Sequence, residues 1–330
     1  MRKTMSVRWL AMLLAVVLCL GYLQPLSTLA TTEPGVADYQ SFLSNLKVLE
    51  QYADEFAATN SKYTAKVLVV NFIRTGVERY NDDNWTTLAG AEITDFVRYV
   101  EGRDAAKGTT AMLLRNIIID EFVLPNGNQV DFGHMFGTLN IAFVASQESA
   151  DLGGWAGDIC DLLFYSKNYG NVPAGTVEER VAYIKNHCFG VNADDAFGMD
   201  DFYGDMDAYY LYHKSLAGDK LSTIMESYFT ADLSDSDRAA YFLNNRFKGV
   251  KTQEEVRTAI YDTYKANMGL RVLEAKRELS GESELRAASC YAFADYLFEQ
   301  AGDRLTGDVG GDEGGNEGGE SDSPAMDNDY

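Results

Sequence analysis

An acid–histidine pair stands at the start of an apolar stretch near the middle of the chain. Asp131 and His134 are three residues apart in VDFGHMFGTLNIAFV. On a helix, this spacing turns both side chains to one side. A carboxylate oxygen and an imidazole nitrogen presented together suit zinc or manganese, so the pair predicts a metal site. The alternative is that Asp131 caps a helix starting at Phe132 and that His134 is buried among its neighbours.

Two further acids repeat this spacing on a second apolar stretch, DLGGWAGDICDLLFY, where Asp158 and Asp161 are again three residues apart. In an antiparallel hairpin of the two stretches, Asp161 is offset from His134 by about 4–5 Å along the helix axis, and Asp158 by about 9 Å. We therefore predict a divalent metal (zinc, manganese or calcium) held by Asp131, His134 and Asp161, with Asp158 as the less direct ligand.

Asp151 and Trp155 begin the second stretch. We expect Asp151 to cap its helix, because it lies too far along the hairpin to share ligands with the histidine. Gly153, Gly154 and Gly157 surround Trp155 and permit a close approach of other backbone. Trp155 is therefore either one wall of a pocket or a core residue between tightly packed helices, and large aromatic residues favour the core.

Another acidic cluster lies in the segment 192–216. Its acids are Asp200, Asp201, Asp205 and Asp207. Alternating acids can bind calcium through oxygen atoms, but this segment lacks the closing Glu of an EF-hand loop. We favour the alternative of a solvated loop and helix start with Asp in the first turn.

Several familiar catalytic motifs are missing from the sequence. His187 and Cys188 are adjacent, which prevents an easy hydrogen bond between nucleophile and base, and no cysteine-protease motif surrounds them. The chain has no Gly-rich phosphate loop, Gly-x-Ser-x-Gly elbow or His-Glu-x-x-His motif. The sequence therefore implies no organic cofactor.

Apolar residues at helical spacing predict an all-α fold whose centre is a buried pair of adjacent helices, 131–145 and 151–165. The domain could divide into two lobes that meet near this pair. A Val-rich segment within 64–80 also permits a strand, but its length favours a helix. The other expected helices are 38–60, 85–100, 110–122, 176–187, 220–229, 234–247, 252–267 and 282–299, and the expected loops include 102–108 and 125–128.

The ends of the chain differ from its middle. Residues 1–30 combine a basic head, an apolar run of about 11–14 residues and small residues before Ala30, as in a cleaved signal peptide. That run is shorter than the roughly 20 residues of a membrane-spanning helix. We predict a secreted protein with a helical domain at 31–305, no transmembrane span after cleavage, and a disordered acidic Gly-rich tail at 306–330.

The net charge of the chain limits its partners. It is −22 for the whole chain, and the loss of three basic residues with the signal peptide makes it −25. So acidic a surface repels nucleic acid, which leaves an extracellular substrate or protein as the expected partner. Three cysteines would remain after cleavage, Cys160, Cys188 and Cys290, which permits either one bridge with a free thiol or three buried thiols.

Four segments carry a resemblance to a known group of proteins. They are VVNFIRTGVERYNDDNWTTLAG, VDFGHMFGTLN, DLGGWAGDICDLL and DDFYGDMDAYYLY. In the order of these segments, over residues 64–212, the chain resembles a family of uncharacterised secreted proteins of Gram-positive bacteria. The resemblance implies secretion and supplies no catalytic residues.

Two functions are consistent with these features. The first is a metal-dependent hydrolase that acts on an extracellular or cell-envelope substrate, with a metal-bound water as nucleophile. The second is a non-catalytic secreted protein that binds a partner and whose central acids only cap helices and accept hydrogen bonds.

Overall fold

The computed structural model describes residues 36–60, 63–81, 91–106, 121–123, 129–146, 150–151, 154–159, 169–189, 199–268 and 282–305. Helix accounts for 84% of these residues, which confirms the all-α prediction. One short antiparallel hairpin lies among the described ranges, with β1 (Glu121–Val123) paired to β2 (Gln129–Asp131). The predicted signal peptide, the predicted tail, the turn at 125–128, Cys160 and Asp161 lie outside the described residues.

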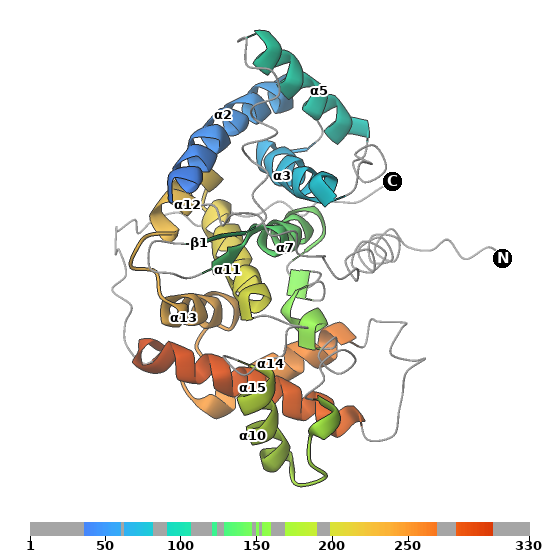
Figure 1. Cartoon of the computed structure of the whole chain (residues 1–330), viewed down its shortest axis with the longest axis vertical. Helices are drawn as coiled ribbons and strands as arrows, with labels where there is room; N and C mark the ends of the chain where they lie inside the picture. The colour runs from blue at the N-terminus through green and yellow to red at the C-terminus, as the bar shows by residue number, and fades with distance from the viewer. Residues whose placement is uncertain are drawn as a thin grey trace, which may run out of the picture.

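One group of helices forms the upper part of the molecule in Figure 1. It contains α2 (Val36–Asn60), α3 (Ala65–Asn81), α5 (Ala91–Ala106) and α12 (Leu221–Tyr228). The apolar stripe of α2 is buried as its spacing predicts, and the aromatic ring of Phe42 lies 4.8 Å from that of Phe132 on α7 (Phe132–Val144). These helices and the first half of α7 enclose one apolar core.

A second group forms the lower part of the molecule (Figure 1). It contains α10 (Val177–Cys188), α13 (Asp235–Arg246), α14 (Gln253–Met268) and α15 (Glu282–Ala301), with the short 3₁₀ helices η1 (Tyr169–Asn171) and η4 (Gly302–Leu305). Trp155 is 1% exposed and stacks on Phe293 of α15, with 5.9 Å between ring centroids, so the core interpretation of Trp155 is correct. The second half of α7 also contributes to this core.

α11 (Met199–Leu216) joins the two groups and packs beside α7 in the middle of the molecule (Figure 1). Ala208 and Leu211 face the first core, whereas Phe202 and Tyr209 face the second. The prediction of a loop at 192–216 is therefore wrong from residue 199 onward. A helix buried on two sides shows no single apolar stripe, and its Asp and Tyr residues resemble a polar loop in composition.

Other differences from the expected elements concern helix ends. α5 runs through Gly102 to Ala106 rather than ending near residue 100, because the residues around this glycine are good helix formers. Phe122 lies in β1, not at the end of a helix. The predicted capping box at Thr176 and the predicted helix start at Ser234 are both confirmed.

Cys188 and Cys290 are buried free thiols, which excludes a bridge between them. Within the described ranges, every helix is too short or too polar to cross a lipid bilayer.

Candidate metal centre

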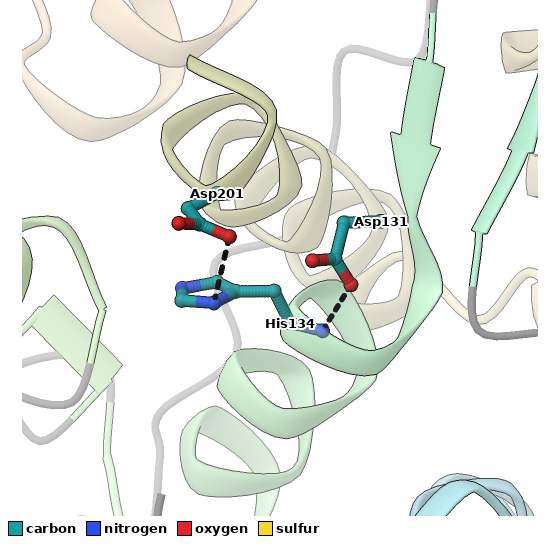
Figure 2. A group of neighbouring side chains, drawn as sticks. All are labelled: Asp131, His134 and Asp201. Carbon is teal, nitrogen blue, oxygen red and sulfur yellow. Dashed lines mark hydrogen bonds and ion pairs between the residues drawn. The ribbon is translucent and has the colours of Figure 1, made fainter. Parts of the chain in front are cut away.

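His134 lies in the first turn of α7, directly after the cap supplied by Asp131. The Oδ1 atom of Asp131 accepts the backbone N–H of His134 at 2.7 Å, which is the capping role expected of this residue. Figure 2 shows that the carboxylate of Asp131 and the imidazole of His134 lie on the same side of the helix start. Capping and proximity to the histidine therefore occur together.

α11 presents two acids to this histidine. Asp201 and Asp205 are four residues apart and so lie on one face of α11. The Oδ1 atom of Asp201 is 3.7 Å from Nδ1 of His134 (Figure 2), and Oδ1 of Asp205 is 3.2 Å from its Nε2. Gly204 allows this approach, because a Cβ atom there would lie 3.4 Å from Cβ of His134.

Asp158 reaches the same imidazole from the second central helix. Its Oδ2 atom is 3.5 Å from Nε2 of His134. Beneath it, Gly154 supports the carboxylate of Asp205, and a Cβ atom added to this glycine would come within 2.6 Å of Oδ1. The close approach expected at the glycines around Trp155 therefore serves the packing of an acid at Gly154.

The polar atoms at the centre of the cluster lack hydrogen-bond partners. Asp158 is 8% exposed and Asp205 is fully buried. In the part of the chain that the structure describes, the Oδ2 atoms of Asp158 and Asp205 and the Nε2 atom of His134 are buried without a hydrogen bond. Thr138 donates to Oδ1 of Asp205 at 2.6 Å, which leaves its other oxygen unsatisfied. Buried carboxylate oxygens without donors are costly unless a cation or a proton compensates them.

The electrostatics of the cluster point to the same deficit of positive charge. Burial lowers the pKa of His134, but Asp205 and Asp158 together raise it well above 6.5. Burial raises the pKa of Asp158 to about 6, although His134 opposes this change. Both groups therefore hold protons more strongly than usual, as expected of a site in which acids outnumber cations.

Two ligand sets overlap at the histidine. His134, Asp158 and Asp205 each offer one ligand atom, and these atoms lie within 4.8 Å of one another; Asp131, His134 and Asp201 do the same. One imidazole nitrogen with two carboxylate oxygens is a donor set suited to manganese or zinc, while calcium prefers oxygen alone. The residues present therefore fit a transition metal.

The structure brings together three of the four predicted ligands, Asp131, His134 and Asp158, whereas Asp161 lies outside the described residues. The expected offset of about 9 Å for Asp158 does not describe its carboxylate, because an offset along parallel axes ignores the reach of two side chains. Asp201 and Asp205 were missed as site residues. Their signal was the four-residue spacing among aromatic residues of helical period.

The remaining acids are structural. Asp151 is fully buried and accepts hydrogen bonds from Arg246 at 2.5 Å, from Trp155 at 2.9 Å and from Tyr209, so its expected role as a simple helix cap is wrong. Asp207 is buried against Arg238 rather than solvated. Each of these acids faces an arginine, and neither lies in a ligand set of the candidate centre.

Comparison with known proteins gives one match. The model of the YkzU uncharacterised protein family matches residues 136–311, more than half of the 330-residue chain. The matched segment includes Asp158, Asp201 and Asp205 and begins two residues after His134. Neither a curated protein nor a solved structure matches the chain. The chain therefore belongs to the YkzU uncharacterised protein family.

Proposed function

We propose that this protein is a secreted, divalent-metal-dependent hydrolase whose ion is held by His134, Asp158 and Asp205. The observation that carries the proposal is the set of buried, unpaired atoms around the histidine: Nε2 of His134 and one oxygen of each acid. These atoms converge from three segments of the chain, and a cation among them would offset the cost of burying two carboxylates.

The chemistry of a hydrolase requires an open side to the metal site. The side chains of His134 and Asp201 are 24% and 29% exposed, whereas the carboxylates of Asp158 and Asp205 lie beneath them. A bound zinc or manganese ion lowers the pKa of a coordinated water. On the open side, Asp201 and Asp131 would position that water and accept its proton.

Secretion and the substrate class belong to the same proposal. The basic head, apolar run and small residues of residues 1–30 support export. The net charge of −22 and the resemblance to secreted proteins of Gram-positive bacteria support action outside the cell, on a cell-envelope or peptide substrate.

A second candidate function is a non-catalytic secreted binding protein with a structural metal. The burial of Asp158 and Asp205 favours it, because structural ions are usually enclosed and catalytic ions keep an open coordination position. The two candidates share the metal site and differ in whether a substrate reaches it.

Elemental analysis after purification in metal-free buffer and reloading with manganese or zinc tests the metal site. We expect about one ion per chain in the parent protein and none in His134→Ala or Asp205→Asn. His187→Ala is the matched control, since His187 is exposed on α10 and lies outside both ligand sets. The absence of stoichiometric metal near neutral pH would contradict the proposal.

A second measurement separates the two functions. The loaded protein and its chelated form are compared on panels of peptides, esters and cell-wall fragments. Hydrolysis that disappears on chelation and in His134→Ala, but persists in His187→Ala, supports the hydrolase. Tight metal binding without hydrolysis on any of these substrates favours the structural ion.

A further inference from the structure

A hollow of about 610 Å³ lies apart from the metal site. Its described lining comes from α2, the start of α3, the end of α7, the end of α11 and the turn into α12, and it includes none of the metal ligands proposed above. The volume is in the range of small-molecule sites, which are concave, mostly apolar and equipped with a few polar groups.

One wall of the hollow is apolar. It contains Val67, Phe143, Tyr212, Leu216 and Leu221. The rings of Phe143 and Tyr212 meet edge to face with 5.3 Å between their centroids, which gives the wall a fixed shape. Such a wall suits an aliphatic or aromatic side chain.

The rim of the hollow collects the exposed apolar residues of the described chain. Leu216 lines the hollow and is 63% exposed. Among the described residues, the other exposed large apolar side chains are Tyr63 and Val144, each adjacent in sequence to a lining residue. Apolar surface gathered at the mouth of a cavity is typical of a binding site.

A lysine with spare hydrogen-bonding capacity points to the charge of the ligand. Lys66 lines the hollow, and its Nζ atom donates to the backbone carbonyl of Ser215. In the described part of the chain it has no carboxylate within ion-pair distance. Partial burial lowers its pKa, although Asp219 and Glu50 oppose this change. An ammonium group carries three donors, so a ligand carboxylate could use the remaining two.

The same lining supplies negative charge. Glu50 is 6% exposed and already accepts the backbone N–H of Ser222 at 3.0 Å. Asp54 pairs with Lys220 at 2.8 Å, but both side chains are more than half exposed, so this pair is weak and easily opened. Two cations and two anions therefore line one apolar hollow.

We propose that this hollow binds a zwitterionic ligand with an apolar side chain, namely a free amino acid or a short peptide. The carboxylate of the ligand pairs with Lys66, its ammonium group faces Asp54 and Glu50, and its side chain packs on Phe143, Tyr212 and Leu216. Both charges of the ligand are matched, which explains how an anionic group is accepted by so acidic a protein.

Calorimetric titration of the full chain tests this site with four probes: L-leucine, L-leucyl-L-leucine, N-acetyl-L-leucine and L-leucinamide. We expect at least one of the first two to bind, and blocking either charged end to weaken binding at least about tenfold, as for a lost charge-assisted hydrogen bond. Equal binding of N-acetyl-L-leucine would overturn the zwitterion assignment, and failure of all four probes would overturn the site.

Variants locate the binding. Lys66→Met should weaken binding of the zwitterion at least about tenfold. Lys47→Met is the matched control, because Lys47 lies on α2 outside the hollow and pairs only with exposed Glu226. Leu216→Glu should weaken binding as well, and since Leu216 is exposed this variant should keep the fold. Unchanged binding in both hollow variants would overturn the proposal, and so would binding that requires the metal.

Discussion

Two acids on α11 lie two residues apart, are both fully buried, and have opposite environments. Asp207 receives two hydrogen bonds from the guanidinium of Arg238, at 3.0 and 2.5 Å, and one from the hydroxyl of Tyr228 at 2.8 Å. Asp205 receives one hydrogen bond, from Thr138, and shares an imidazole with another buried acid. The residue type and helix are the same, while the supply of donors differs.

This difference separates a structural acid from a functional one. The charge of Asp207 is balanced by Arg238, whose guanidinium also lies 4.4 Å from the ring of Tyr203. Around Asp205, no arginine or lysine forms an ion pair with the carboxylate in the described part of the chain. A buried acid without a fixed cation is expected to bind one from solution, or to take up a proton.

Removal of the fixed cation should have the largest effect. Arg238→Met leaves Asp207 buried and unpaired, which should reduce the free energy of unfolding by about 3–5 kcal/mol. Urea unfolding measures this loss, and it should not depend on added metal. Arg98→Met, at an arginine whose side chain is 71% exposed, is the control. A loss below about 1 kcal/mol at Arg238 would remove the contrast between the two acids.

Addition of a cation should stabilise the other acid. Manganese or zinc at about 1,000 times its dissociation constant should raise the free energy of unfolding by about 4 kcal/mol. The gain should vanish in Asp205→Asn and persist in Asp207→Asn, which removes a charge of the same kind from the same helix. Equal gains in both variants would place the ion elsewhere.

Proton uptake should replace the metal at low pH. Because burial raises the pKa of Asp158 from 3.8 to about 6, the folded state binds a proton that the unfolded state has released. The stability of the metal-free protein should therefore fall as pH rises from about 4 to about 6, by up to about 3 kcal/mol. The raised pKa of His134 extends this loss above pH 6.5. Denaturant midpoints measured in chelator should show the slope, and Asp158→Asn should flatten its acidic part.

The smallest effect is expected where charge is removed without loss of a donor. Asp205→Asn in the metal-free protein should change stability by less than about 1 kcal/mol, because its amide oxygen can still accept from Thr138 and repulsion with Asp158 is relieved. Asp207→Asn should cost more, since Arg238 then loses its counter-ion. Thermal unfolding of the two variants in chelator gives the comparison directly.

Predictability from sequence followed the distance between interacting residues. The capping of α10 by Thr176 with Glu179 and the helical state of α3 could be predicted, because the groups involved are neighbours in the chain. Asp131 and His134 were recognised for the same reason. The helix α11 was mistaken for a loop because it is buried on two faces and its acidic positions face other parts of the protein, so local composition gave no clear stripe.

The sequence by itself determined the helical class, the helix starts and the presence of an acid–histidine pair, all of which depend on interactions within a few residues. The tertiary structure alone decided which acids meet His134. That choice depends on α11 docking against α7, on Gly204 and Gly154 leaving room for the approach, and on two separate cores holding the helices in place. Asp205 and Asp207 are indistinguishable by local pattern, because the arginine beside one and the histidine beside the other come from distant parts of the chain.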